Sequence, residues 1–223
     1  MTDAHIRNDD RRGRLGFAVG LVAILVLVAV VLIFVRDQSL MSEDGPIEIL
    51  SAAGYVVCIA LMFRLRHLVS ILPFVVTLLA MGLRELDMDK RPFTEGLLKS
   101  RQYIGDTVGP VERIVSLVIL LGIIAAVVTL IYRHGRTFLA ALKRANGAAL
   151  CVAGAIGLVV VSKSLDGLGR KLEPLGITIT EAQNTYAGMI EETLELGIPL
   201  MLGIAILAVP VALVQARPAH GGT

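Results

Sequence analysis

The feature of this sequence that most constrains its fold is an apolar run at residues 15–35, which contains no charged side chain. The hydrocarbon core of a bilayer is about 30 Å thick, and a helix that rises about 1.5 Å per residue crosses it in roughly 20 residues. The run therefore predicts a transmembrane helix. It is longer than the apolar part of a cleavable signal peptide, and no small-x-small cleavage site follows it.

Five further apolar runs predict additional spans, and three of them are short enough to need polar residues at one end. The composition agrees, because 55% hydrophobic residues, 18% charged residues and a mean hydropathy of +0.76 exclude an ordinary soluble domain. We therefore predict an all-α fold, a polytopic bundle of about six transmembrane helices over residues 15–216, with cytoplasmic tails at 1–14 and 217–223. The further runs lie at residues 47–63, 69–83, 114–132, 147–161 and 194–214.

Basic residues indicate how this bundle is oriented. Arg11, Arg12 and Arg14 precede the first span, and the loop after it has more acidic than basic residues. Arginine and lysine collect on the cytoplasmic side of membranes, so we predict that both termini are cytoplasmic. The same threading places the basic loops at 64–67 and 132–144 inside. We predict a multi-pass protein of the cell membrane, the inner membrane in a bacterial-type cell, whose basic loops face anionic lipid and not nucleic acid.

Acidic side chains gather at the opposite, extracytoplasmic ends of four predicted helices. Like charges one helical turn apart repel each other, and the repulsion grows where water is scarce. A cation, a basic side chain from a neighbouring helix or a retained proton must compensate them. The sequence therefore predicts a shared acidic pocket, formed among Glu48, Glu85, Asp89, Asp166, Glu192 and Glu195, with Arg84 and Lys90 offsetting part of the charge. Glu191, Lys163 and Arg170 are predicted on the same membrane face, and Glu43 and Asp44 are expected in headgroups and water there.

The stretch RELDMDK at residues 84–90 directly follows the third apolar run. If this helix continues until Pro92 ends it, Glu85 and Asp89 share one face and Asp87 lies on another side. On the second helix, Glu48 is followed on the same face by a serine and a tyrosine at i+3 and i+7. The spacing thus predicts which polar groups enter the pocket and which do not.

Other local patterns predict further details of the bundle. TEAQ at 180–183 is a capping-box pattern, so the last helix is predicted to begin before the bilayer. Pro199 in that helix frees a carbonyl near Glu195, which is either part of a ligand site or only a proline of the kind common in membrane helices. Closely spaced small residues predict that the helix at 147–161 is central. Residues 94–103 predict a short helix in the interface or a lid.

The two cysteines, Cys58 and Cys151, are predicted at different depths of the bundle. Such positions favour buried free thiols and not a disulfide. The four histidines, His5, His67, His134 and His220, fall on the cytoplasmic side or in the tails, which disfavours a zinc site in the acidic pocket.

An acidic pocket of this kind predicts oxygen ligands for a divalent cation, and Mg²⁺, Ca²⁺ or Mn²⁺ suits carboxylates better than Zn²⁺ does. A bound metal would activate water, one unbound carboxylate would act as base, and a lysine or Arg84 would hold an anionic group. The predicted metal ligands are Glu48, Glu85, Asp89, Glu192 and Glu195, and the predicted catalytic residues are Glu85, Asp166, Glu192 and Lys163.

Two stretches, EDGPIEILSAAGYVV at 43–57 and TLLAMGLRELDMDKRPF at 77–93, resemble helices of the alkaline ceramidase and adiponectin-receptor superfamily of membrane hydrolases. In that superfamily one helix has a serine or threonine followed by an acid at its outer end, and the last helix has an HxxxH pair. Here the comparable place holds EETLE at 191–195. The resemblance implies a membrane-embedded hydrolase.

Three classes of function remain open from the sequence. The first is a metal-assisted hydrolase or transferase that acts on a lipid-linked or small extracytoplasmic substrate. The second is a transporter or ion-binding protein that uses the same charges, although a path across the membrane would need acceptors at mid-depth. The third is a scaffold whose charges pair with each other or with a partner. The bilayer is the one partner that all three share, and the oligomeric state stays open.

Overall fold

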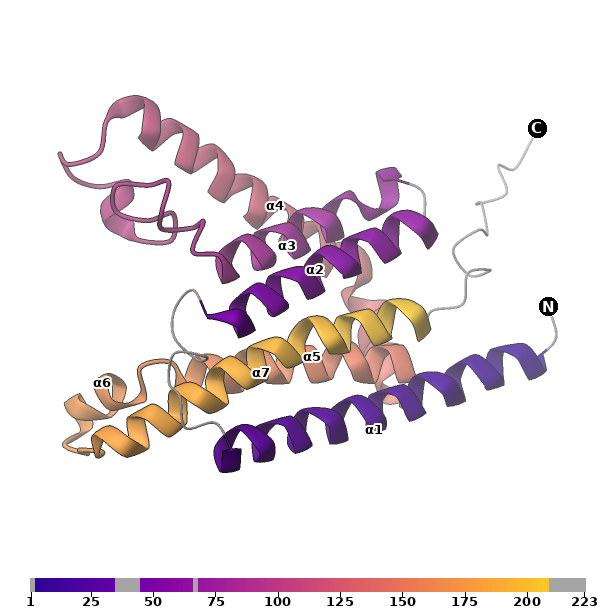
Figure 1. The fold of residues 1–223 in the computed structure, drawn as a ribbon. Helices are drawn as coiled ribbons and strands as arrows, with labels where there is room; N and C mark the ends of the chain where they lie inside the picture. The colour runs from indigo at the N-terminus through magenta and orange to yellow at the C-terminus, as the bar shows by residue number, and fades with distance from the viewer. Residues whose placement is uncertain (1–2, 35–44, 66–67, 209–223) are drawn as a thin grey trace, which may run out of the picture.

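The computed structural model describes residues 3–34, 45–65 and 68–208. Over these residues the chain forms helices and turns without a β-strand, which confirms the predicted all-α class (Figure 1). The longer elements are α1 (Asp3–Phe34), α2 (Pro46–Leu65), α3 (Leu68–Glu85), α4 (Pro110–Lys143), α5 (Gly147–Leu165) and α7 (Glu181–Ala208), and the short ones are η2 (Ser100–Gln102), α6 (Leu168–Leu172) and η3 (Glu173–Leu175).

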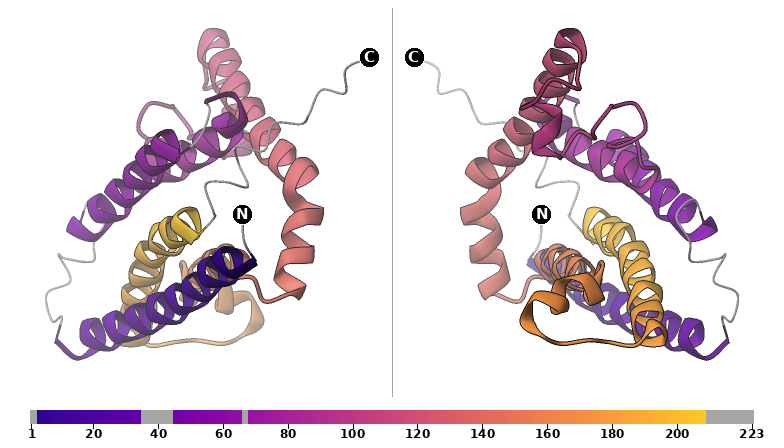
Figure 2. Two further views of the ribbon diagram at one scale, coloured as in Figure 1. Left: turned by 90° about the vertical axis from the view of Figure 1, so that its right-hand side faces the viewer. Right: turned by 90° about the vertical axis from the view of Figure 1, so that its left-hand side faces the viewer.

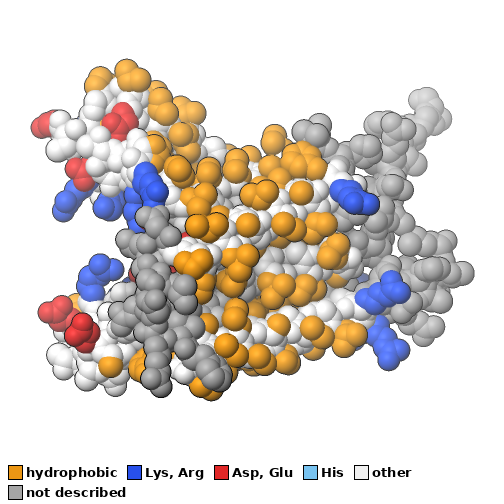
Figure 3. All heavy atoms as spheres, viewed as in Figure 1, with side chains coloured by type: hydrophobic (Ala, Val, Ile, Leu, Met, Phe, Trp, Pro, Cys, Tyr) orange, Lys and Arg blue, Asp and Glu red, His pale blue; other side chains and the backbone are white. Residues whose placement is uncertain are grey.

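Four helices are long and apolar enough to cross a membrane, over Asp10–Ile33, Pro46–Arg64, Pro110–Lys143 and Gly147–Leu165. They contain the predicted spans at 47–63, 114–132 and 147–161 and most of the span at 15–35, which confirms a membrane protein. The side of the molecule seen in Figure 3 shows a broad apolar band between two charged ends. The predicted spans at 69–83 and 194–214 fall on α3 and α7, and residues 209–214 lie outside the described part.

Helix α7 is the centre of the bundle. It packs against α1, α2 and α5, while α2 packs on α3 and α3 on α4. Both views in Figure 2 show α7 between the α1 and α5 side and the α2 and α3 side. The core around it is formed by Ile24, Tyr55, Cys58, Ile198 and Met201. The prediction that residues 147–161 form the central helix is therefore only partly right, because α5 has an exposed side that includes Ile156 and Val160.

The start of α7 confirms the predicted capping box. The Thr180 amide donates to Gln183 Oε1 at 2.9 Å, and the Gln183 amide donates to Thr180 Oγ1 at 3.2 Å. Further along, Pro199 packs against Gly54 of α2, and its carbonyl accepts a hydrogen bond from Cys58 Sγ at 3.3 Å. Pro199 is thus part of the core between α2 and α7. Both cysteines are buried and free, as predicted.

The segment between α3 and α4 differs from its prediction. A helix at 94–103 was expected, but these residues form turns and the three-residue η2. Gly96 has φ +101°, and the Gln102 side chain accepts from the Glu95 amide at 2.9 Å, so a side chain replaces helical hydrogen bonding. Glu112 at the start of α4 accepts from Gln102 Nε2 at 2.8 Å and from the Thr94 amide at 2.7 Å. This folds the segment against α4.

Helices α1 and α5 approach each other closely at Gly13 and Gly147. A Cβ added to Gly147 would lie 2.3 Å from the Arg14 amide nitrogen and 2.5 Å from Gly13 Cα. Asp10 Oδ1 accepts from the Gly147 amide at 3.0 Å and from Asn146 Nδ2 at 3.1 Å. Small residues allow backbones to approach in lipid, and here the approach also lets one carboxylate satisfy the start of the neighbouring helix.

We predict that Gly147→Ala destabilises the protein by about 2–3 kcal/mol, because the new methyl group meets backbone that must move as a whole helix. Gly157→Ala in the same helix is the matched control. Nothing lies within 4 Å of its added Cβ, so this change should be neutral or stabilise by up to about 1 kcal/mol. Thermal unfolding in detergent measures both. Equal effects of the two substitutions would contradict the close approach of α1 and α5.

Candidate functional site

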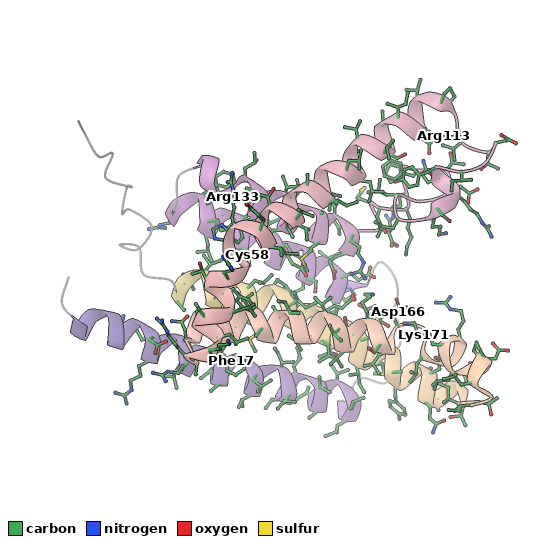
Figure 4. The ribbon with its side chains drawn as sticks, turned by 180° about the vertical axis from the view of Figure 1, so that it is seen from behind. Phe17, Cys58, Arg113, Arg133, Asp166 and Lys171 are labelled. Carbon is green, nitrogen blue, oxygen red and sulfur yellow. The ribbon has the colours of Figure 1, made fainter. Side chains whose placement is uncertain are left out.

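A cavity of about 240 Å³ lies at one end of the bundle, where α2 begins and α3 and α5 end. Helix α7 borders it with Glu191, Glu192 and Glu195. Figure 4 shows this end through Asp166, at the end of α5, while Arg133 of α4 lies toward the opposite end. We call it the charged cavity. Every lining side chain is ionisable: Glu48, Arg84, Glu85, Asp87, Asp89, Lys90, Lys163, Asp166, Glu191, Glu192 and Glu195.

The structure brings together all the residues that were predicted as metal ligands or catalytic groups. Four segments far apart in the sequence each supply at least one of them, which is the arrangement that the sequence predicted. Three other charged residues that were predicted on the same membrane face are different. Arg170 does not line the charged cavity, and residues 43 and 44 lie outside the described part of the chain. Asp87, which was predicted to lie on another side, is a lining residue.

The position of Asp87 follows from how α3 ends. The helix stops at Glu85 and does not continue to Pro92, so the predicted one-turn spacing of Glu85 and Asp89 on a helix is wrong. Asp87 has φ +53°, its amide donates to the Arg84 carbonyl at 3.0 Å, and the Met88 amide donates to the carbonyl of residue 83 at 2.9 Å. This is a Schellman ending with an aspartate in the left-handed position that glycine usually takes. The turn directs the rest of RELDMDK back over the cavity.

Glu195 is the centre of an ion-pair network inside the cavity. Its side chain is only 8% exposed, and its Oε1 lies 2.9 Å from Lys163 Nζ and 3.3 Å from Arg84 Nη2. Ser162 Oγ lies 3.5 Å from the same oxygen. Lys163 also pairs with Glu191 Oε1 at 3.3 Å. One carboxylate of α7 is therefore neutralised by one cation from α3 and one from α5.

A second contact of Lys163, to Asp166 Oδ2 at 3.4 Å, joins the end of α5 to the same network. At the rim, Lys90 Nζ pairs with Asp87 Oδ1 at 2.7 Å. All three cations of the cavity are thus engaged with carboxylates, yet eight carboxylates face three cations. The excess of negative charge must be compensated by protons or by a cationic ligand.

Two of these carboxylates retain protons more strongly than usual. Glu85 and Glu192 lie just outside the predicted spans at 69–83 and 194–214. Burial, followed by the charge of Glu195, raises the pKa of Glu85 to about 7 even though Arg84 opposes the shift. Burial and then the charges of Glu195 and Glu48 raise the pKa of Glu192 to about 8. Protons on these two groups reduce the repulsion at neutral pH.

A polar stripe leads from the cavity into the bundle along α2. Glu48 is followed at i+3 and i+7 by Ser51 and Tyr55, each 1% exposed, as the spacing predicted. Neither hydroxyl oxygen has a hydrogen-bond partner among the described residues. Tyr55 packs against α3, since a Cβ on Gly82 would lie 3.1 Å from Tyr55 Cβ. The deeper wall below the cavity is therefore polar and not purely apolar.

The carboxylates of the charged cavity are not arranged as a metal-coordination site among the described residues. Within residues 3–34, 45–65 and 68–208, no three His, Cys, Asp or Glu side chains lie in positions that could hold a metal ion. Glu195, a predicted ligand, is already paired with Arg84 and Lys163. The predicted ligands share one cavity, but they form a coordination set only if side chains rearrange.

Among the residues that the structure describes with their side chains, His134 lies away from the charged cavity, and the cytoplasmic position of the histidines stays a prediction. Its ring lies in a tilted contact with the Phe74 ring, with ring centroids 5.3 Å apart. Comparisons of the chain with protein-family models, with curated proteins and with solved structures found no match. The resemblance to membrane hydrolases stays a prediction, and the site is defined by its geometry.

We predict that Glu192→Gln removes a pH dependence of stability. A pKa raised from 4.5 to about 8 on folding means that the native state binds this proton more tightly, so its stabilising contribution is complete below about pH 4.5 and is lost as pH rises through 8. The variant should therefore match the wild type near pH 4.5 and be more stable by about 1–2 kcal/mol at pH 9. Thermal unfolding at both pH values measures this.

Glu195→Gln is the control of opposite sign. It removes the partner of two cations, so it should destabilise by about 1–3 kcal/mol at neutral pH. If Glu192→Gln were destabilising by the same amount at pH 4.5 and pH 9, Glu192 would be an ion-pair partner and not a protonated member of a crowded acidic group.

Proposed function

We propose that this chain is a six-span membrane protein with both termini in the cytoplasm, whose charged cavity at the extracytoplasmic boundary binds a cationic group. The observation that carries the proposal is the excess of carboxylates: eight acidic and three basic side chains line one small cavity. A cationic ligand would relieve their repulsion, and it would be attracted by the same field. In this proposal the predicted spans at 69–83, on α3, and at 194–214, which begins on α7, are added to the four candidate spans and give six.

The distribution of basic residues supports the orientation. The second half of α4 and the loop after it contain Arg133, Arg136, Lys143 and Arg144, and in Figure 4 Arg133 lies toward the end opposite the cavity. At 34 residues, α4 is about 51 Å long, so it extends beyond a 30 Å hydrocarbon core. The positive-inside tendency therefore supports a cytoplasmic position for this basic extension and an extracytoplasmic position for the charged cavity.

A metal-assisted hydrolase or transferase is the second candidate. The observation in its favour is Glu85, because a carboxylate with a pKa of about 7 is suited to act as a general base at neutral pH. In this mechanism Lys163 or Arg84 would hold an anionic group of a lipid-linked or small substrate. Mg²⁺, Ca²⁺ or Mn²⁺, if bound by the remaining carboxylates, would supply an activated water. A scaffold role, with the ion pairs as its purpose, is the third.

The orientation is tested by single cysteines and a membrane-impermeant thiol reagent. Cys58 and Cys151 are 1% and 0% exposed, so the wild-type chain should give little background. We predict that Asp106→Cys, in the segment between α3 and α4, is labelled in intact cells. Thr137→Cys, near the other end of α4, should be labelled only after the membrane is opened. The reverse pattern would place the cavity in the cytoplasm.

Cation binding is tested on the purified protein with ethanolamine and, separately, with Mg²⁺, Ca²⁺ and Mn²⁺. We predict that a cation that binds the cavity raises the unfolding midpoint by roughly 5–10 °C at about 100 times its Kd. Glu192→Gln should reduce the shift, whereas Glu173→Gln, an exposed residue outside the cavity, should not. Stoichiometric bound metal that is lost in Glu192→Gln would favour the hydrolase. No shift with any cation would favour the scaffold.

A further inference from the structure

A second and larger hollow, of about 870 Å³, lies beside the charged cavity between α3, the segment after it and α4. We call it the α3–α4 groove. Its walls are largely apolar and include Ala80 and Leu83 of α3, Phe93 of the connecting segment, and Val115, Ile119 and Ile123 of α4. Helix α4 is a candidate membrane span, and α3 is a span in the proposed topology, so in that topology hydrocarbon would surround the groove.

The length of the groove matches one leaflet of a bilayer. Its lining on α4 runs from residue 110 to residue 123, which is about 20 Å along a helix. One leaflet contributes about 15 Å of hydrocarbon. The groove begins at the end of α4 that also bears the charged cavity, so it extends inward from the membrane surface by about the depth of a single acyl chain.

Arg84 and Asp89 join the two hollows, because both residues line the charged cavity and also the α3–α4 groove. The Arg84 side chain is 38% exposed, and its Nη2 is engaged with Glu195 Oε1. Asp89 Oδ1 is buried and has no hydrogen-bond partner within the described residues. An apolar chain in the groove would therefore end beside a guanidinium and a carboxylate, with further carboxylates behind them.

We propose that the α3–α4 groove and the charged cavity together bind one phospholipid with a primary-amine headgroup, its acyl chain in the groove and its headgroup between Arg84 and the carboxylates. This inference rests on the proposed binding of a cationic group and names the source of that group. The proposal accounts for the two hollows together: an apolar groove about as deep as one leaflet lies next to an acid-rich cavity, and Arg84 lines both.

The charges select the headgroup. A phosphate diester is recognised by a guanidinium with two parallel N–H donors, which is the role for Arg84. The excess of carboxylates disfavours a purely anionic headgroup and attracts a cation beyond the phosphate. A primary ammonium has three N–H donors for carboxylate oxygens such as those of Asp89 and Glu192, whereas a quaternary ammonium has none. The site therefore prefers a phosphoethanolamine headgroup to phosphocholine or phosphoglycerol.

The absence of tryptophan from the chain allows a direct test by fluorescence quenching. Ile119→Trp places an indole in the groove, and Leu121→Trp is the matched control, two residues along α4 and therefore on another side of it. Each variant is reconstituted in phosphatidylcholine vesicles that contain increasing fractions of brominated phosphatidylethanolamine, phosphatidylcholine or phosphatidylglycerol. We expect half-maximal quenching of Ile119→Trp at a phosphatidylethanolamine fraction at least threefold lower than for the other two lipids.

Leu121→Trp should show no headgroup preference, because ordinary bilayer lipid surrounds it. Added to Ile119→Trp, Ala80→Phe should abolish the preference by filling the groove, and Asp89→Asn should weaken it by removing a partner of the ammonium. Equal quenching of Ile119→Trp by all three lipids, or a preference that survives Ala80→Phe, would overturn the inference.

Soluble ethanolamine separates this failure from a failure of the proposed function. Stabilisation of the wild type by ethanolamine, together with equal quenching by all three lipids, would retain a cation site and reject its lipid. If Ala80→Phe abolishes the lipid preference but is still stabilised by ethanolamine, both proposals are supported. If neither ethanolamine nor any of the three metal ions stabilises the wild type, and no lipid headgroup is preferred, both proposals are rejected.

Discussion

The interaction on which this architecture depends is the burial of Glu195 between Lys163 and Arg84. An ionised carboxylate at 8% exposure is stable only when it is paired, so the ends of α3 and α5 must bring their cations to α7 in one register. In lipid, apolar side chains gain little by meeting one another, since the surroundings are equally apolar. The polar end therefore contributes specificity that the apolar surfaces cannot supply.

After this pairing, the cavity still has an excess of acidic over basic side chains. Three cations are already engaged, and the remaining carboxylates must retain protons or attract a ligand. The pKa values of Glu85 and Glu192 are raised to about 7 and about 8, so at neutral pH these two side chains reduce the repulsion by retaining protons. A ligand that supplies an ammonium could replace those protons. Binding, the protonation state of the cavity and the stability of the helix ends are therefore linked.

Close packing elsewhere in the bundle depends on small residues and local capping. Gly147 lets α5 meet α1 at backbone distance, and Asp10 satisfies the exposed amide there. The central helix is nevertheless α7, because it packs against α1, α2 and α5 while α5 keeps an exposed side. A glycine count in one helix indicates that it can pack closely, but it does not show how many neighbours it has.

The sequence by itself determined the helical membrane class, four of the spans, the capping box at Thr180 and the membership of most of the charged cavity, because hydropathy and helical period are local properties. Only the tertiary structure decided that α3 ends at Glu85, so that Asp87 turns into the cavity, and that Lys163 and Arg84 share Glu195. It also placed the α3–α4 groove beside these charges. The shared ion pairs and the groove depend on the relative positions of separate helices, which no local pattern specifies.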